Sequence, residues 1–164
     1  MIEILKNTPQ WVYVVFTVVL YLGLASCFEG KASVRGIFIL PAVFLLSSVY
    51  GLVTRENLGA LTTIAWVTGF GITAVVLYRV TLVTGTGIRR EQDHLIIPGD
   101  VSVLIVSMVF FSIKFWFGYK SAVDTDWSRQ VSFQAIDSLT SGIVAGFFAG
   151  RSFGHYKIAK RFGL

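Results

Sequence analysis

The sequence predicts an all-α fold, a bundle of five transmembrane helices with the N-terminus outside and the C-terminus inside. Of the 164 residues, 54% are hydrophobic and 14% are charged, and the mean hydropathy is +0.72. Soluble domains carry about 25% charged residues. Five apolar runs are long enough to cross a bilayer whose hydrocarbon core is about 30 Å thick. At this length we expect one integral membrane domain, residues 1–164.

The first three predicted spans are 10–28, 36–53 and 58–83. The first begins after Thr8 and Pro9, since a hydroxyl cap followed by proline favours a helix start, and it carries no charge. The second contains Pro41, which should kink it. The third is longer than a bilayer requires and should tilt or protrude.

The last two predicted spans are 101–119 and 133–154. Asp100 is a suitable cap for the fourth span. The polar stretch 84–99 is expected to be a cytoplasmic loop, whose part 88–97 can form a short hairpin or an interfacial segment. The last ten residues, 155–164, form a basic tail.

The distribution of basic residues predicts the orientation. With the N-terminus outside, the outer segments hold four positive residues and the inner segments hold nine. The nine inner residues are Lys31, Arg35, Arg79, Arg89, Arg90, Arg151, Lys157, Lys160 and Arg161. Cytoplasmic loops carry an excess of Lys and Arg, so this orientation is favoured. The same distribution explains the net charge of +5 without a nucleic-acid partner.

Small residues recur every four positions along the fifth span. They are Ser138, Gly142, Gly146, Gly150 and Gly154, and we call them the glycine ridge. Residues at i and i+4 stack on one helix face, and such a face allows another helix backbone to approach closely. Asp137 and Arg151 lie roughly opposite the ridge at 3.6 residues per turn. The fifth span should therefore contact protein on two sides.

Lys114 and Asp137 are charged residues inside predicted spans. Counted from the outer ends of their helices, they lie at depths of about 9 and 7.5 Å. A lone charge near the middle of a bilayer costs on the order of 3 kcal/mol or more. We therefore expect a Lys114–Asp137 ion pair, either as a structural link between two helices or as a functional site.

Four residues of the third span share a further face: Thr62, Trp66, Gly69 and Thr73. This pattern is typical of a helix-packing stripe in membranes. The alternative is that the face lines a solute path. We expect no cofactor and no metal, because Cys27 is the only cysteine and only two histidines are present.

These features support three hypotheses for function. The first is a non-enzymatic membrane protein that associates through the glycine ridge, with Gly146 at its centre, as a homo-oligomer or with a membrane-protein partner. In the intramolecular alternative, the ridge seats the fifth span within its own chain. The second hypothesis is a small ion or solute transporter or channel that uses Lys114 and Asp137. The third is a membrane enzyme, for which His94, Asp93 and Arg90 are the only candidates, with Arg151 in the same pocket.

Four short segments carry a resemblance to a known family: 8–11 (TPQW), 38–43 (FILPAV), 97–99 (IPG) and 145–151 (AGFFAGR). With these segments the chain resembles a family of small bacterial inner-membrane proteins known only as a domain of unknown function. The resemblance covers most of the chain. It implies a location in the bacterial inner membrane and brings no activity or site residues.

Overall fold

The computed structural model describes residues 10–32, 36–53, 59–85, 89–91 and 94–161. Its helices are α2 (Gln10–Ser26), η1 (Gly36–Phe38), α3 (Ile39–Val53), α4 (Ala60–Thr84), α5 (Val101–Val123), α6 (Thr125–Ser128) and α7 (Val131–Arg161). Its strands are β1 (Gly30–Ala32), β2 (Arg89–Glu91) and β3 (His94–Ile97). Several sequence predictions concern residues outside these ranges. They are the helix start at Thr8 and Pro9, the connection between the second and third predicted spans, Arg35 and Asp93.

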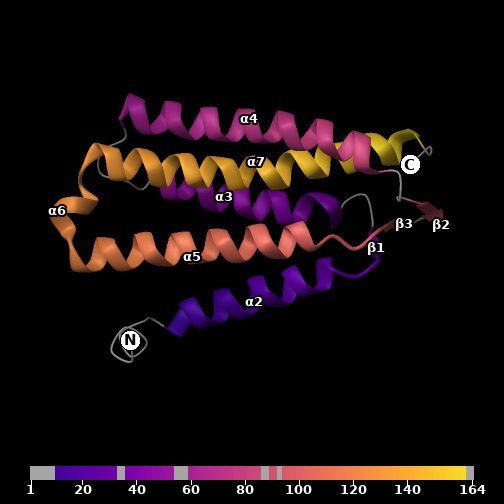
Figure 1. Cartoon of the computed structure of the whole chain (residues 1–164), viewed down its shortest axis with the longest axis horizontal. Coiled ribbons are helices and arrows are strands. Elements are labelled where there is room, and N and C mark those ends of the chain that lie inside the picture. Colours follow the sequence, from indigo (N-terminus) through magenta and orange to yellow (C-terminus); the bar gives the residue numbers. More distant parts are fainter. Residues whose placement is uncertain (1–9, 33–35, 54–58, 86–88, 92–93, 162–164) are drawn as a thin grey trace.

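The five long helices run up and down beside one another (Figure 1). One end of the bundle carries the short helix α6, and the opposite end carries the three strands. Among the residues that the structure describes, four segments are long and apolar enough to cross a membrane: Gly36–Val53, Ala60–Thr84, Val101–Val123 and Val131–Arg161. These helices suggest a membrane protein. The first predicted span, 10–28, contains α2, a charge-free helix of 17 residues, which is shorter than these four.

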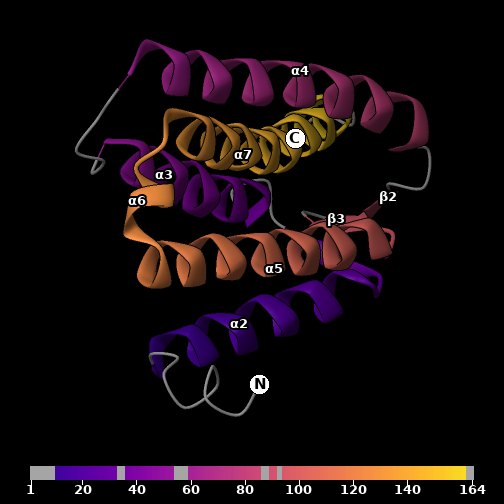
Figure 2. The same ribbon diagram turned by 60° about the vertical axis from the view of Figure 1, so that its left-hand side comes forward.

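Helix α7 is the central helix, with α3, α4 and α5 around it (Figure 2). In its most apolar stretch 56% of the residues are buried, compared with at most 17% in the other three candidate spans. Since its neighbours shield it, α7 can carry serine, glycine and charged residues that a lipid-facing helix would not tolerate. The fifth predicted span is thus an interior helix.

Helices α4 and α7 pack with their backbones in close approach. A Cβ atom added at Gly146 would lie 2.5 Å from the carbonyl oxygen of Phe70, and one added at Gly69 would lie 2.7 Å from that of Leu139. Such separations exclude any side chain. The glycines therefore let the two helices pack far closer than Leu or Val would permit.

Helix α2 packs on α5 at the edge of the bundle (Figure 2). A Cβ atom at Gly23 would lie 2.6 Å from a methyl carbon of Leu104, and the rings of Phe16 and Phe111 are 5.1 Å apart. The amide of Asp100 donates to the carbonyl of Ser26 over 2.7 Å. These contacts join α2 and α5 into one helix pair.

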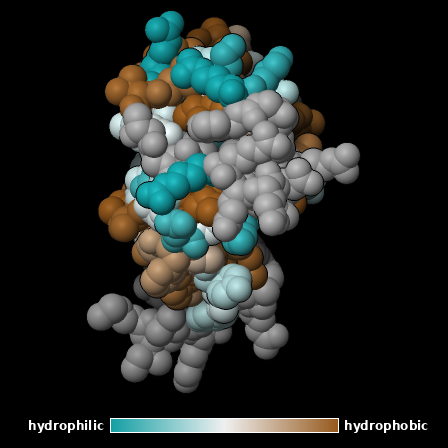
Figure 3. Space-filling model, turned by 90° about the vertical axis from the view of Figure 1, so that its right-hand side faces the viewer, coloured by the Kyte–Doolittle hydropathy of each residue, from teal (hydrophilic) through white to brown (hydrophobic). Residues whose placement is uncertain are grey.

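The strands form an antiparallel sheet in the order β1-β3-β2. Within the segment 88–97, β2 and β3 thus pair as the two strands of the hairpin alternative, and β1 from the first loop pairs with β3, which the sequence analysis did not predict. The sheet lies at the end of the bundle where α7 finishes, and Figure 3 shows hydrophilic side chains among hydrophobic ones there. The exposed basic residues at this end are Lys31, Arg89, Lys157, Lys160 and Arg161.

Two helices extend beyond the spans predicted for them. Helix α5 continues to Val123, four residues past the expected end of the fourth span. Helix α7 continues to Arg161, so most of the expected basic tail, 155–164, is helix. Ile158 and Ala159 on this extension are buried against Ile37. Packing of this apolar face explains why the helix continues into a basic segment.

Candidate functional site

A cavity of about 350 Å³ lies between α5 and α7, at the end of the bundle that carries α6. Its lining residues come from α5, α6 and α7. The lining residues are Lys114, Phe117, Gly118 and Ser121 of α5, Ser128 of α6, and Phe133, Gln134 and Asp137 of α7. We call it the α5–α7 pocket.

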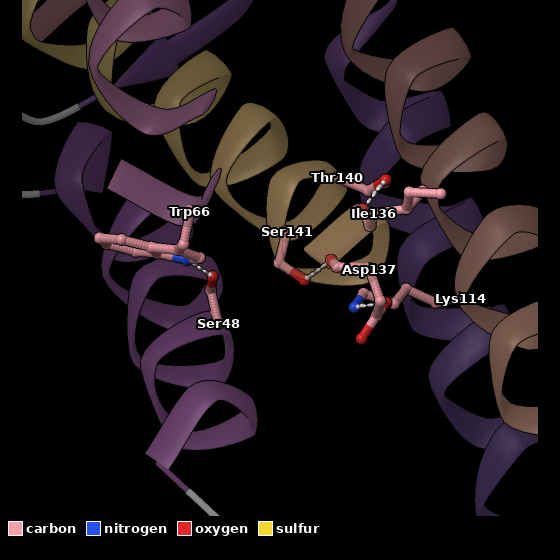
Figure 4. Close-up of polar contacts among 7 residues, drawn as sticks. All are labelled: Ser48, Trp66, Lys114, Ile136, Asp137, Thr140 and Ser141. Atoms are coloured by element: carbon pink, nitrogen blue, oxygen red, sulfur yellow. Dashed lines mark hydrogen bonds and ion pairs between the residues drawn. The ribbon is translucent and has the colours of Figure 1, made fainter. Parts of the chain in front are cut away.

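Lys114 and Asp137 meet in this pocket in an ion pair between Nζ and Oδ1 (Figure 4). The exposed fractions of the two side chains are 31% for Lys114 and 11% for Asp137. The two charged residues that residue counting placed at similar depths therefore form an ion pair, and both line the cavity. Nζ of Lys114 also lies 5.8 Å from the centre of the Phe110 ring, which adds a cation–π contact.

Helical spacing explains how α5 supplies half of the lining. Lys114, Phe117, Gly118 and Ser121 stand at i, i+3, i+4 and i+7, which is one helix face. The absence of a side chain at Gly118 leaves this face open, because no atom lies within 4 Å of a Cβ built there.

Helix α7 brings Asp137 and its neighbours to the pocket. The hydroxyl of Ser141 donates to the backbone carbonyl of Asp137 over 2.7 Å, one turn further along the helix (Figure 4). Gln134 stands one turn before Asp137 and lines the same pocket. The pocket therefore combines one cation, one anion, one amide and two serine hydroxyls.

Aromatic rings form the wall of the pocket next to α6. The centroids of the Phe117 and Phe133 rings are 4.7 Å apart, and Trp127 of α6 lies 4.7 Å from Phe133. Trp116 contacts both Phe117 and Trp127. This cluster packs α6 over the junction of α5 and α7 and gives the pocket an apolar wall on that side.

A second ion pair joins α5 and α7 near the sheet, between Arg151 and Asp100. Asp100 is also the N-cap of α5 and accepts from the amide of Ser102 over 2.7 Å. Partial burial raises the pKa of Asp100, but the hydrogen bonds from Ser102 and Arg151, with the charge of Arg151, outweigh it and hold this pKa below its ordinary value.

The two ion pairs have matching positions on the antiparallel helices. Fourteen residues separate Asp100 from Lys114, and fourteen separate Asp137 from Arg151. Fourteen residues are two heptads, so both pairs lie on one α5–α7 seam, about 21 Å apart. The residues between them are mainly apolar and include Val103, Phe110, Val144, Phe147 and Phe148, although Ser107 and Ser141 of the same two segments are also buried.

The glycine ridge is occupied by α4 of the same chain. Cβ atoms at Gly142, Gly146 and Gly150 would each collide with a carbonyl oxygen of α4, and one at Gly154 would lie 2.6 Å from Cβ of Thr81. Ser138 is buried on the same helix. In this structure α4 of the same chain therefore fills the ridge on which the hypothesis of association with another chain was based. The intramolecular alternative is the one observed.

The face of α4 at Thr62, Trp66, Gly69 and Thr73 is mainly engaged in packing. Thr62 is buried and its hydroxyl donates to the carbonyl of Gly59. The indole of Trp66 donates to Ser48 of α3 (Figure 4). Gly69 lies against the backbone of α7, and Thr73 is half-buried. These contacts favour a packing stripe over a solute path.

The structure does not test the proposed enzyme candidates. His94 and Arg90 are described only as backbone in β3 and β2, Asp93 lies outside the described residues, and Arg151 pairs with Asp100. Within the described part of the chain, no three His, Cys, Asp or Glu side chains gather as a metal site would require.

Sequence reasoning missed part of the pocket. The lining residues that the sequence did not indicate are Phe117, Ser128, Phe133 and Gln134. Helical spacing does indicate Gly118 and Ser121, because they stand on the helix face of Lys114. The useful signal was spacing, since Gln134 is one turn from Asp137. No pattern in the chain predicts Ser128, which reaches the pocket only because α6 folds across the junction.

Comparison with known proteins gives a family but no function. A family model described as "Family of unknown function (DUF6622)" matches residues 1–162. Neither the curated proteins nor the solved structures yield a match to the chain.

Proposed function

Because this chain belongs to the DUF6622 family, whose function is unknown, we propose a function from the site itself. In this proposal the protein is a small transporter or channel for an ion or solute, and the α5–α7 pocket is its binding site. The observation that carries this proposal is an ion pair between two candidate membrane helices that borders a cavity instead of dry packing. Ionisable residues inside membrane bundles often mark substrate pathways.

Transport also needs a part of the bundle that can move. Helices α4 and α7 form a backbone-to-backbone contact through glycines, whereas α5 reaches α7 through side chains: two ion pairs, aromatic rings and an apolar cluster. Side-chain contacts exchange more easily than an interlocked backbone. We therefore propose that the α2–α5 pair moves against α3, α4 and α7, and that the apolar layer between the two ion pairs is the gate.

We propose five spans, with the N-terminus outside and the C-terminus inside, in the bacterial inner membrane implied by the sequence resemblance. The sheet agrees with α3 and α4 as two crossings, since β1 and β3 pair and their loops must share one side of the membrane. Helix α2 lies along α5, and 17 residues span about 26 Å, close to the thickness of the hydrocarbon core. The exposed basic residues at the sheet end favour the inside for that end.

Cysteine labelling in intact cells tests this topology. In a Cys27→Ser background, we expect Asp126→Cys on α6 to react with a membrane-impermeant maleimide, because its end of the bundle faces outward. Lys160→Cys should react only after permeabilisation. An epitope tag at the N-terminus should bind antibody in intact spheroplasts. If the N-terminal tag is protected while Asp126→Cys reacts in intact cells, the protein has four spans. If Lys160→Cys reacts in intact cells and Asp126→Cys reacts only after permeabilisation, the orientation is the opposite one.

Uptake into proteoliposomes tests the function. Four solute classes are compared: rubidium as a cation, chloride as an anion, alanine as a zwitterion and glycerol as a neutral polyol. We expect at least one class to enter faster with the wild type than with Lys114→Met/Asp137→Leu, in which apolar groups replace both charges. Replacing a buried pair in this way is often neutral for stability. Equal uptake of all four classes by the two proteins would reject the transport proposal.

A further inference from the structure

We infer that the solute is a small zwitterion of the α-amino-acid class, bound with its carboxylate at Lys114 and its ammonium at Asp137. This inference rests on the proposed function, because it concerns the ligand of the same pocket. Its basis is the combination of charges, neutral groups and volume in the α5–α7 pocket.

The charge balance of the pocket selects against a simple ion. Lys114 and Asp137 are the only two ionised side chains among the eight that line it, so the lining is neutral overall. An anion that takes Lys114 away from Asp137 would leave a carboxylate without its cation, and a cation at Asp137 would do the same to Lys114. An uncompensated charge at a partly buried site is unfavourable. A zwitterion supplies a partner to each side chain at once.

The arrangement of the two charges indicates how far apart the ligand's charges are. Nζ of Lys114 and Oδ1 of Asp137 are in direct contact, so a ligand that meets both needs its own charges close together. In an α-amino acid the ammonium and carboxylate are attached to the same carbon. A zwitterion with widely separated charges would match the pair poorly.

The greater exposure of Lys114, 31% against 11% for Asp137, suggests that the carboxylate of the ligand binds first. The ammonium group then approaches the more buried Asp137. In the resulting arrangement each charge has an opposite neighbour, and the original pair is restored when the ligand leaves.

The neutral lining suits the rest of such a molecule. Ser121, Ser128 and Gln134 offer hydroxyl and amide groups, and Phe117 and Phe133 offer apolar surface for a short side chain. A volume of about 350 Å³ is at the lower end of the range for ligand pockets. The pocket therefore favours a small amino acid over a large solute.

Binding of four matched probes to purified protein in nanodiscs tests the inference by calorimetry. The probes are L-alanine, its methyl ester (a cation), N-acetyl-L-alanine (an anion) and N-acetyl-L-alanine amide (neutral). We expect L-alanine to bind at least about tenfold more tightly than the other three, since only it pairs with both charges.

Single substitutions should change the preferred charge. Lys114→Met leaves Asp137 as the pocket's anion, so the methyl ester should become the tightest ligand. Asp137→Asn leaves Lys114, so N-acetyl-L-alanine should become the tightest ligand. Lys120→Met is the matched control: Lys120 is on α5, lies over Trp127 and is not part of the pocket lining, and its loss should leave the preference unchanged.

The outcomes separate this inference from the proposed function. If L-alanine binds no better than its charged analogues, or if rubidium or chloride alone enters proteoliposomes, the zwitterion is wrong while transport stands. If no probe binds and no solute class is taken up, both proposals fail. A charge preference that stays the same in Lys114→Met and Asp137→Asn would also overturn the inference.

Discussion

Replacing Gly146 by leucine should abolish the docking of α7 on α4. A Cβ atom at this position would lie 2.5 Å from the carbonyl oxygen of Phe70 and 3.1 Å from its Cα and from the amide nitrogen of Ala74. These are backbone atoms, which cannot rotate away as a side chain can. Even Gly146→Ala should cost about 1–3 kcal/mol, the usual range for overpacking, and leucine should cost more.

Thermal unfolding in mild detergent, followed by tryptophan fluorescence, measures this effect. Gly71→Ala is the matched control, because Gly71 is on α4 and has no atom within 4 Å of a built Cβ. There alanine should stabilise by about 0.5–1 kcal/mol, since glycine is a poor helix former. Opposite shifts for the two alanine variants support the packing argument.

The same proteins distinguish the two uses of the glycine ridge. Native mass spectrometry should show Gly146→Leu losing its folded charge-state distribution whatever the number of protomers in the wild type. A Gly146→Leu protein that unfolds at the wild-type temperature but forms fewer protomers would contradict the structure. It would mean that the ridge faces another chain.

Removal of Lys114 alone should destabilise the bundle by about 2–4 kcal/mol, since Asp137 then remains buried without its cation. The expected cost stays below the highest values for buried pairs because Lys114 is about a third exposed. Lys114→Met retains most of the side-chain volume, so loss of charge is the main change. Chemical unfolding in detergent or nanodiscs measures the difference.

The double variant and the exchanged pair provide the controls for this prediction. Lys114→Met/Asp137→Leu should recover most of the lost stability, because neither charge remains. Lys114→Asp/Asp137→Lys should recover part of it by restoring an ion pair in reverse. If Lys114→Met is as stable as the wild type, the pair is a weak surface contact and Asp137 is solvated.

The sequence predicted the α5–α7 ion pair more specifically than it predicted the pocket. Lys114 and Asp137 are isolated charges in apolar runs, and the depth of each follows from counting residues to the end of its helix. The pocket depends on Ser128 and Phe133, which approach Lys114 only after α6 turns the chain through the junction. Such convergence has no periodic pattern in the sequence.

For the glycine ridge as well, the sequence predicted the packing surface, but only the structure identified the partner. Spacing showed that Gly142, Gly146 and Gly150 form a face suited to close packing, but spacing does not name the partner. Helix α4 runs parallel to α7, and the carbonyl groups of Trp66, Phe70 and Ala74 face these glycines at matching intervals of four residues. Close packing against α4 of the same chain and close packing against a helix of another chain would both require the same glycines.

By itself the sequence determined the helical, apolar character of the chain, the approximate positions of its long helices, apart from the C-terminal extension of α7, and the two charges that need partners. These properties depend on local composition and on helical periodicity, which each segment carries alone. The tertiary structure decided that α7 is central, that α4 fills the glycine ridge, that β1 joins the hairpin and that a cavity borders the ion pair. These features depend on contacts between residues far apart in the chain, whose geometry emerges only when all the helices pack together.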